Sequence, residues 1–168
     1  MKIKLTPELS YLIGLWRKNR VFEGIGVRGG KNLLEVFSKT VLDLNLTTSD
    51  KLLSDDEKVY FYHTAYRKFF QEVEKEQLER FKYLNDYAAS YLAGMFDGSG
   101  EIDERGLVSI AFANSQDELL FLRLGFMTRK RGDRLVFEKP LVFLAFIKNY
   151  LKIKNDHRAF DLIKAPKK

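Results

Sequence analysis

The sequence of 168 residues contains no cysteine, which excludes a disulfide framework, a thiolate metal site and a thiol nucleophile. Histidine occurs only at His63 and His157, too few for a zinc site made of histidines alone. No apolar run approaches the ~20 residues of a membrane-spanning helix, and the first residues lack the apolar centre of a signal peptide. We therefore expect an intracellular, cytoplasmic protein without a membrane segment.

What the chain does have is apolar and basic residues. Hydrophobic residues make up 45% of the sequence, including 14 phenylalanines, enough for a sizeable core. The net charge is +6, and residues 1–84 and 85–168 each contribute +3. A basic excess in both halves is compatible with a nucleic-acid surface that spans them. Ordinary solubility charge is the alternative explanation.

A short pattern occurs twice, 80 positions apart. Residues 10–15 (Ser-Tyr-Leu-Ile-Gly-Leu) match residues 90–95 (Ser-Tyr-Leu-Ala-Gly-Met). A glycine inside a helix costs about 1 kcal/mol relative to alanine, and in each copy a serine four positions earlier lies on the same helical face. Small residues on one face let two helix backbones approach closely. We expect two helices to pack on each other through Ser10, Gly14, Ser90, Ala93 and Gly94.

Periodicity and capping signals predict an α+β protein whose halves each read helix, hairpin, helix, hairpin, helix. Helix starts are predicted at Thr6-Pro7, at Thr64, and at a capping box of Ser115 and Glu118. The charged run 72–82 is typical of a solvated helix. We expect a first repeat over 1–84, with a helical linker at about 71–84, and a second repeat over 85–168. Helices are expected over 7–18, 32–44, 64–73, 86–97, 115 onward, 141–150 and 155–164, and strands over 21–30, 51–53, 59–62, 101–103, 107–113, 127–130 and 134–137.

Residues 92–100 (Leu-Ala-Gly-Met-Phe-Asp-Gly-Ser-Gly) resemble the nine-residue motif of the LAGLIDADG homing endonucleases, and residues 12–20 resemble a degenerate copy. The resemblance implies a single-chain monomer with two αββαββα repeats. Its motif helices would pack at a pseudo-twofold axis, and its antiparallel sheets would form a saddle over double-stranded DNA. Lys154, in the segment 151–154, matches a basic residue that the family places beside its active site.

The sequence differs from the family at the positions of the catalytic acids. In the family an acid precedes the last glycine of each motif, and the two acids bind the metal ions that activate water. Here Asn19 and Ser99 occupy those positions, and Arg20 replaces the glycine of the first motif. Neither Asn19 nor Ser99 supplies the negative charge that Mg²⁺ requires. The sequence therefore predicts a protein that binds nucleic acid, most simply duplex DNA, without a metal, a cofactor or metal-dependent cleavage.

Two alternatives stay open. An active endonuclease would need Mg²⁺ and displaced acids, for which Asp97, Glu23 and Glu101 are the candidates. Asp97 could instead cap the helix exit or bond the partner helix, and strand alternation could turn the two glutamates to solvent. A protein-interaction module that keeps only the fold is the second alternative. DNA and structured RNA are not separated by the sequence.

The basic residues gather in three places. Residues 123–154 carry nine Lys or Arg and two acids, which favours a surface that contacts the phosphate backbone. The end of the first motif helix is a second cluster, although its cations could also simply stabilise the helix C-terminus. The candidate DNA-binding residues are Arg17, Lys18, Arg20, Arg28, Lys31, Arg105, Arg129, Lys130, Arg131, Arg134 and Lys154.

Overall fold

The structure is a computed structural model that describes residues 2–111 and 114–163. The ends of the strand predicted over 107–113 and of the helix predicted to residue 164 lie outside these ranges. The first half contains α1 (Pro7–Asn19), β1 (Ile25–Arg28), α2 (Lys31–Asp43), β2 (Leu53–Ser54), β3 (Lys58–Phe61), α3 (Thr64–Lys75) and α4 (Gln77–Arg80). The second half contains α5 (Asp86–Ser99), β4 (Gly100–Ile102), β5 (Val108–Ala111), α6 (Gln116–Arg123), β6 (Thr128–Arg131), β7 (Arg134–Phe137), α7 (Pro140–Ile147) and the 3₁₀ helices η1 (Lys148–Tyr150) and η2 (Arg158–Leu162).

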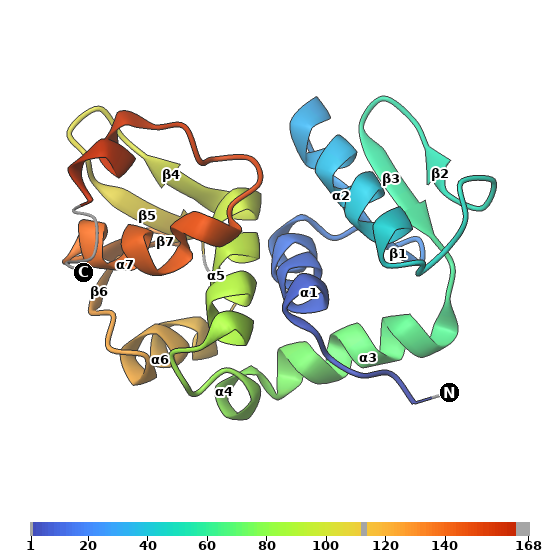
Figure 1. The fold of residues 1–168 in the computed structure, drawn as a ribbon, viewed down its shortest axis with the longest axis horizontal. Helices are drawn as coiled ribbons and strands as arrows, with labels where there is room; N and C mark the ends of the chain where they lie inside the picture. The colour runs from blue at the N-terminus through green and yellow to red at the C-terminus, as the bar shows by residue number, and fades with distance from the viewer. Residues whose placement is uncertain (1, 112–113, 164–168) are drawn as a thin grey trace.

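The motif helices α1 and α5 lie side by side at the middle of the molecule, between the two sheets (Figure 1). A Cβ on Gly14 would lie 2.2 Å from the carbonyl oxygen of Tyr91, and one on Gly94 would lie 2.0 Å from that of Tyr11. The two glycines thus make reciprocal contacts, each against the backbone of the other helix. Ser10, Ser90 and Ala93 are buried on these helices. The absence of side-chain bulk is therefore what allows the helices to approach.

Two antiparallel sheets flank this helix pair. The strand order is β1-β3-β2 in the first sheet and β4-β5-β7-β6 in the second. Alternation along the strands buries one face of each, as Val59 and Phe61 show in β3. In the second sheet, Phe137 of β7 stacks on Phe143 of α7 with ring centroids 3.8 Å apart and meets Phe121 of α6 edge-on at 5.0 Å. The opposite face of each sheet is not covered by these helices.

The first half departs from the predicted pattern of two hairpins. Residues 20–27 form a tight turn joined by the single bridge between Arg20 and Val27, and β1 pairs with β3. The backbone of Val21 donates to the Gly26 carbonyl at 3.1 Å, and Gly24 takes a φ of +54°, which glycine adopts without strain. The first predicted hairpin is therefore reduced to a compact loop and the strand β1, and the first sheet has three strands.

Helix starts were predicted with mixed success. Thr6 caps α1 by accepting from the Leu9 amide at 3.1 Å, as predicted. The predicted cap at Thr64 is wrong. Thr64 is the first residue of α3, and the cap is His63, whose Nδ1 accepts from the Tyr66 amide. Ser115 is the N-cap of α6, as predicted, but its side chain makes no capping hydrogen bond, and Asn114 Oδ1 accepts from the Gln116 amide instead.

Two longer-range expectations also change. The last helix is a short 3₁₀ turn, η2, and not an α-helix from residue 155. In the charged segment between the halves, Gln77 is fully buried, so this segment is not a purely solvated helix. The repeat boundaries at 84 and 85 stay a prediction. No helix in the described part of the chain is long and apolar enough to cross a membrane.

Candidate nucleic-acid interface

The C-terminal ends of α1 and α5 meet at Asn19 and Ser99, the two positions where the sequence resemblance predicts acids. Asn19 Nδ2 donates to the Gly98 carbonyl oxygen at 2.8 Å, which brings Asn19 against the residue that precedes Ser99. A Cβ on Gly98 would lie only 2.8 Å from this nitrogen. The amide of Asn19 therefore satisfies a carbonyl at the end of the partner helix, where an acid would repel it.

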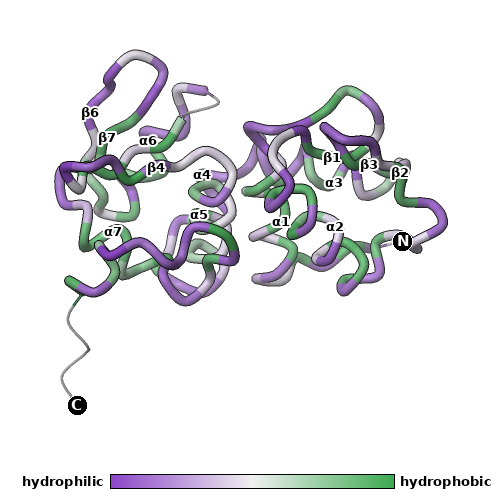
Figure 2. The backbone as a smooth tube through the Cα atoms, turned by 90° about the horizontal axis from the view of Figure 1, so that it is seen from above, coloured by the Kyte–Doolittle hydropathy of each residue, from purple (hydrophilic) through white to green (hydrophobic). Residues whose placement is uncertain are grey.

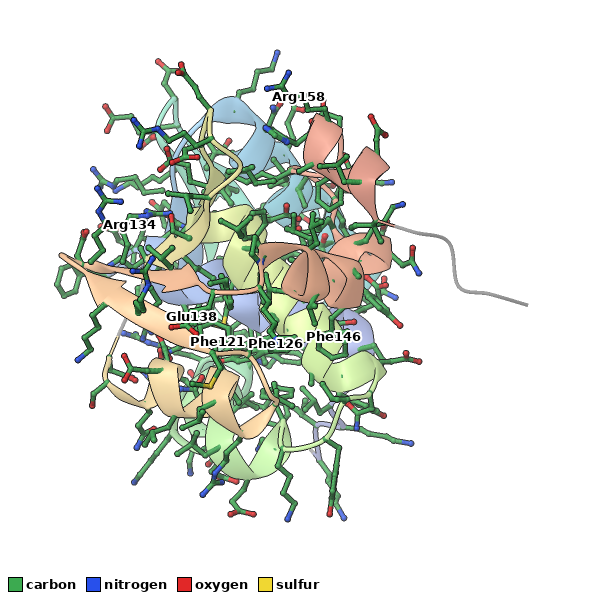
Figure 3. All side chains as sticks on the ribbon, turned by 90° about the vertical axis from the view of Figure 1, so that its left-hand side faces the viewer. Phe121, Phe126, Arg134, Glu138, Phe146 and Arg158 are labelled. Atoms are coloured by element: carbon green, nitrogen blue, oxygen red, sulfur yellow. The ribbon has the colours of Figure 1, made fainter. Side chains whose placement is uncertain are left out.

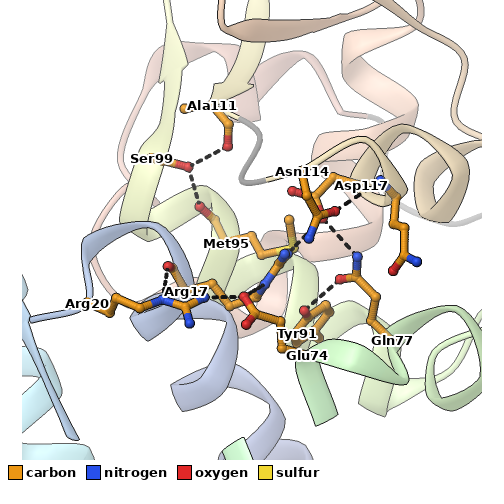
Figure 4. A network of polar contacts seen from close by, with 11 residues as sticks. Arg17, Arg20, Glu74, Gln77, Tyr91, Met95, Ser99, Ala111, Asn114 and Asp117 are labelled. Atoms are coloured by element: carbon orange, nitrogen blue, oxygen red, sulfur yellow. Dashed lines mark hydrogen bonds and ion pairs between the residues drawn. The ribbon is translucent and has the colours of Figure 1, made fainter. Parts of the chain in front are cut away.

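The hydroxyl of Ser99 points back to the protein backbone. Its Oγ lies 3.2 Å from the Met95 carbonyl oxygen and 3.3 Å from that of Ala111 (Figure 4). A serine that bonds the carbonyl four residues earlier in its own helix is a common arrangement at helix ends. The Ser99 hydroxyl is thus a neutral donor to backbone carbonyls, and Ser99 places no charge at the end of α5.

Two cations converge on the end of α5. Arg134 Nη2 donates to the Ser99 carbonyl at 2.9 Å, and its Nε donates to Ser109 Oγ at 2.8 Å. Lys154 Nζ donates to the Gly100 carbonyl at 2.6 Å. Burial lowers the pKa of Lys154, and the nearby charge of Arg134 lowers it further. Two cations therefore lie beside Ser99, and the carboxylates of Asp97 and Glu101 also lie near Lys154.

Asp97, a candidate metal ligand, is buried and accepts hydrogen bonds from other parts of the protein. It is only 3% exposed, and Tyr11 donates its hydroxyl to Asp97 Oδ2 at 2.6 Å. Its two oxygens also accept the backbone amides of Lys152, Ile153 and Lys154 at 2.8, 3.2 and 2.8 Å. One carboxylate thus ties the partner helix α1 and the segment 152–154 to the end of α5.

The remaining acids do not complete a metal site. Glu23 pairs with Lys58 at 3.2 Å, and the largely exposed Glu101 lies 4.0 Å from Arg134. Among the described residues, no group of three His, Asp or Glu side chains is arranged to hold a metal ion. Mg²⁺ prefers several oxygen ligands around negative charge. The side chains present at the helix ends do not fit a Mg²⁺ ion.

The contact between Tyr11 and Asp97 predicts a loss of stability at alkaline pH. Burial and the adjacent carboxylate raise the pKa of Tyr11 above its ordinary value. A raised pKa in the folded state stabilises the protein fully below pH ~10, where tyrosine ionises in unfolded chains, and this stability falls as the pH rises further. In urea titrations above that pH, Tyr11→Phe should reduce the decline by about 1.4 kcal/mol per pH unit. Tyr83→Phe, which changes an exposed tyrosine, should leave the decline of stability with pH unchanged. If Tyr11→Phe shows the same decline as the wild type, the burial of Tyr11 beside Asp97 is not its cause.

Arg17 lies in a buried polar network and not on the surface, which corrects its assignment as a phosphate ligand. Its Nε donates to Glu74 at 2.9 Å and its Nη1 to Asp117 at 2.9 Å. Gln77 Nε2 also donates to Asp117 at 2.9 Å, and Tyr91 donates to Gln77 at 2.7 Å (Figure 4). Arg17 is 3% exposed, so its charge links α1, α3 and α6 and is not available to a ligand.

The other two cations of the first motif remain at the surface. The guanidinium of Arg20 lies 4.1 Å from the Trp16 ring and pairs with Glu74. Lys18 is exposed and borders a narrow pocket with Ser99 and Ala111. Arg20 is thus partly neutralised by Glu74, and Lys18 is exposed at the end of α1.

The uncovered face of the second sheet carries three arginines. Residues directly opposite each other in neighbouring strands share a face, and the register pairs Arg131 with Arg134 and Arg129 with Val136. This face is opposite to the one that buries Leu135 and Phe137. Figure 2 shows β6 as hydrophilic and β7 as largely hydrophobic, and Figure 3 shows Arg134 near the edge of the molecule, away from the phenylalanines of the core.

The same register separates Lys130 from this set. Lys130 is paired with Leu135, so its side chain lies on the helix-covered side although it is exposed at the sheet edge. The uncovered face also carries a shallow pocket of about 170 Å³, lined in part by Glu101, Ser109, Arg131 and Arg134. Arg105 is exposed in the turn between β4 and β5. We call Arg105, Arg129, Arg131 and Arg134 together the arginine face.

The basic candidates of the first half are balanced by acids. Arg28 lies 3.5 Å from Glu57, and Lys31 lies 3.8 Å from Glu35. Lys58, which pairs with Arg28 across the strands, was not predicted from the sequence. It also lies next to an acid, Glu23. These cations of the first half therefore share their surface with acids, whereas Arg134 is the arginine of the second sheet that lies 4.0 Å from an acid, Glu101, in the described part of the chain.

Known structures share this fold. Mesophilic variants of the homing endonuclease I-DmoI match with a TM-score of 0.59 and 13% identity, over 84% of this chain and 94% of that one. I-DmoI in complex with DNA and Mn gives 0.55 and 14%, over 84% and 96%. An I-DmoI variant with its target DNA in the presence of Mg gives 0.58 and 11%, over 84% and 95%.

These matches confirm the predicted fold class. The chain has a mixed α+β homing-endonuclease fold with two antiparallel sheets and packed motif helices. No family model matches the sequence, and no curated protein sequence matches it.

Proposed function

We propose that this protein binds double-stranded DNA through the arginine face of its second sheet and does not cleave it with metal ions. The observation that carries this proposal is the alignment of Arg129, Arg131 and Arg134 on one uncovered sheet face. Guanidinium groups bind phosphates with paired hydrogen bonds, and a sheet face can lie along a DNA groove. I-DmoI, whose fold this chain shares, has been seen in complex with DNA.

The chemistry at the helix ends supports binding without cleavage. Asn19 and Ser99 are neutral and bonded to backbone carbonyls, while Arg134 and Lys154 place positive charge beside them. Such a centre attracts a phosphate and repels a metal ion. In this proposal Lys154 and Arg134 hold the DNA backbone at the middle of the site, and Arg129 and Arg131 extend the contact along the sheet.

Binding should depend strongly on salt, because phosphate contacts release counterions. The double variant Arg129→Ala/Arg131→Ala should weaken DNA binding and reduce the slope of log K against log salt by roughly 2, about 1 for each lost contact. Fluorescence anisotropy over a salt series measures both quantities. The matched control, Lys68→Ala, removes an exposed cation from α3 and should leave the slope unchanged. Salt-insensitive binding, or equal losses in both variants, would contradict the proposal.

An active endonuclease is the alternative. It would need acids that come together only when DNA is bound, since Glu23 and Glu101 are engaged with Lys58 and Arg134. Incubating the protein with pooled duplexes and Mg²⁺ or Mn²⁺ tests it. Cuts that disappear in Glu101→Gln would overturn the proposed loss of cleavage, whereas intact duplexes across the pool support it.

A further inference from the structure

The uncovered face of the first sheet is aromatic where that of the second is cationic. The register pairs Tyr60 with Gly26 on one side and with Leu53 on the other, so these residues share the uncovered face. Tyr62 follows at the end of β3 and is 65% exposed. Its ring meets that of Tyr60 edge-on, with centroids 5.9 Å apart. Two tyrosine rings thus stand together on the face opposite to the one that buries Val59 and Phe61.

A third ring comes from the loop that follows α1. Phe22 is 95% exposed, although burial of such a ring normally stabilises a protein by about 2 kcal/mol. The loop is held by the bond from Val21 to Gly26 and by the left-handed backbone of Gly24. A Cβ on Gly24 would lie 3.0 Å from Tyr62 Cδ1, so the ring of Tyr62 rests against this loop. Phe22 belongs to the same loop and borders a pocket with Trp16, Arg20 and Gly24. We call Phe22, Tyr60 and Tyr62, which this loop connects, the aromatic platform.

The place of the platform in the fold relates it to the proposed DNA surface. Phe22 lies three residues beyond Asn19, whose side chain bonds the end of α5. The end of α5 also carries the contacts of Arg134 and Lys154. The platform and the cationic centre are thus attached to the adjoining C-terminal ends of the two motif helices.

The charge of the first sheet offers little to a phosphate. Lys58 is paired with Glu23 at 3.2 Å and Arg28 with Glu57 at 3.5 Å. Lys58 Nζ also lies 5.5 Å from the Tyr60 ring. A ligand that fits both sheets must therefore present phosphates to one and flat aromatic groups to the other. Nucleic acid with unstacked bases has this chemistry, because every base presents a π-face.

We propose that the aromatic platform stacks on unpaired or extruded nucleobases while the second sheet holds the backbone of the flanking duplex. This inference rests on the proposed function and adds a preference for nucleic acid that is locally unpaired. Stacking of a base on an aromatic side chain does not depend on the base's hydrogen-bonding edge. The preference is therefore for an unpaired site and not for one sequence.

The tyrosines also have a structural use, which the test must separate from binding. A Cβ on Gly26 would lie 2.4 Å from Tyr60 Cβ, so Tyr60 covers a glycine of the neighbouring strand and stabilises the sheet. Phe22 makes no comparable contribution at 95% exposure. The decisive variant is therefore Phe22→Ala/Tyr62→Ala, which leaves Tyr60 in place. Its matched control is Tyr83→Ala, because Tyr83 is 66% exposed and lies in the segment between α4 and α5.

The experiment compares two labelled DNA probes of equal length by fluorescence anisotropy, one fully paired and one with unpaired adenines at its centre. The wild type should bind the unpaired probe more tightly by about 5- to 150-fold, the range expected for stacking one base. Phe22→Ala/Tyr62→Ala should lose this preference and keep its affinity for the paired probe. Tyr83→Ala should behave as the wild type, and circular dichroism confirms that all variants are folded.

Each contrary outcome has a distinct meaning. Equal affinity of the wild type for both probes, or the same loss in Tyr83→Ala, overturns the platform while duplex binding stands. Absence of salt-dependent binding to either probe overturns the proposed function itself. If sedimentation shows a dimer that only Phe22→Ala/Tyr62→Ala dissociates, the platform joins two copies of the chain, and the stacking proposal is wrong.

Discussion

Replacing Gly94 by alanine is expected to destabilise the protein by about 3–5 kcal/mol, a large part of the stability of a typical domain. The added Cβ would lie 2.0 Å from the Tyr11 carbonyl oxygen and 2.9 Å from the Leu15 amide nitrogen. Both atoms belong to the backbone of α1, which cannot rotate away as a side chain can. The two motif helices must separate, and all contacts that depend on their distance weaken together.

Urea denaturation measures the loss, and thermal unfolding should show a fall in Tm of roughly 10 °C. Gly14→Ala should have a similar effect, because its Cβ would lie 2.2 Å from the Tyr91 carbonyl oxygen. Gly30→Ala is the control, since its Cβ would meet no atom within 4 Å. Its cost should not exceed that of a poorer helix cap, about 1 kcal/mol. A Gly94→Ala protein as stable as Gly30→Ala would show that the helices do not pack as closely as described.

Arg17→Met is expected to cost about 3–5 kcal/mol of stability without a direct effect on DNA binding. Asp117 is fully buried and receives donors from Arg17 and Gln77, each at 2.9 Å. Methionine fills much of the volume of the arginine, but it leaves the carboxylate of Asp117 buried without its counter-charge. The cost comes mainly from that uncompensated charge, since a buried ion pair by itself adds little net stability.

The double variant Arg17→Met/Asp117→Asn should recover much of the lost stability, because the neutral amide no longer needs a cation. Arg20→Met is the matched control. Its guanidinium pairs with Glu74 but is about one-third exposed, so it should cost less than about 1 kcal/mol. A salt slope of DNA binding that falls in Arg17→Met would instead restore Arg17 to the binding surface. Chemical denaturation and the anisotropy salt series together distinguish the two results.

Some features followed from the sequence because they depend on neighbours a few residues apart. The start of α1 at Thr6, the β6–β7 turn and the alternation of β7 are fixed by local backbone preferences and by period-two patterning. The capping bonds expected at Thr64 and Ser115 show the limit of such rules. An adjacent His63 or Asn114 supplied an equivalent acceptor one position earlier, and sequence spacing alone does not rank two nearby acceptors.

The arginine face could be predicted only in part. The local charge of residues 123–154 pointed to the correct hairpin, but the register decided which cations share its uncovered face. That register placed Lys130 opposite Leu135 and therefore on the other side. The neutralisation of Arg28 by Glu57 and of Lys58 by Glu23 likewise required the pairing of β1 with β3. A shift of one residue would have exchanged the two faces.

The sequence by itself determined the close crossing of two helices, because the spacing of Ser10, Gly14, Ser90 and Gly94 defines one smooth face on any helix. It also led to the prediction that Asn19 and Ser99 occupy the two acid positions of the motif. Only the tertiary structure decided what the neighbouring charges do. Arg17 bonds Glu74 and Asp117, which lie 57 and 100 positions away in the sequence. Asp97 accepts a hydrogen bond from Tyr11, which lies 86 positions away. These partners meet because helix packing, and not chain proximity, sets which charged groups are removed from water.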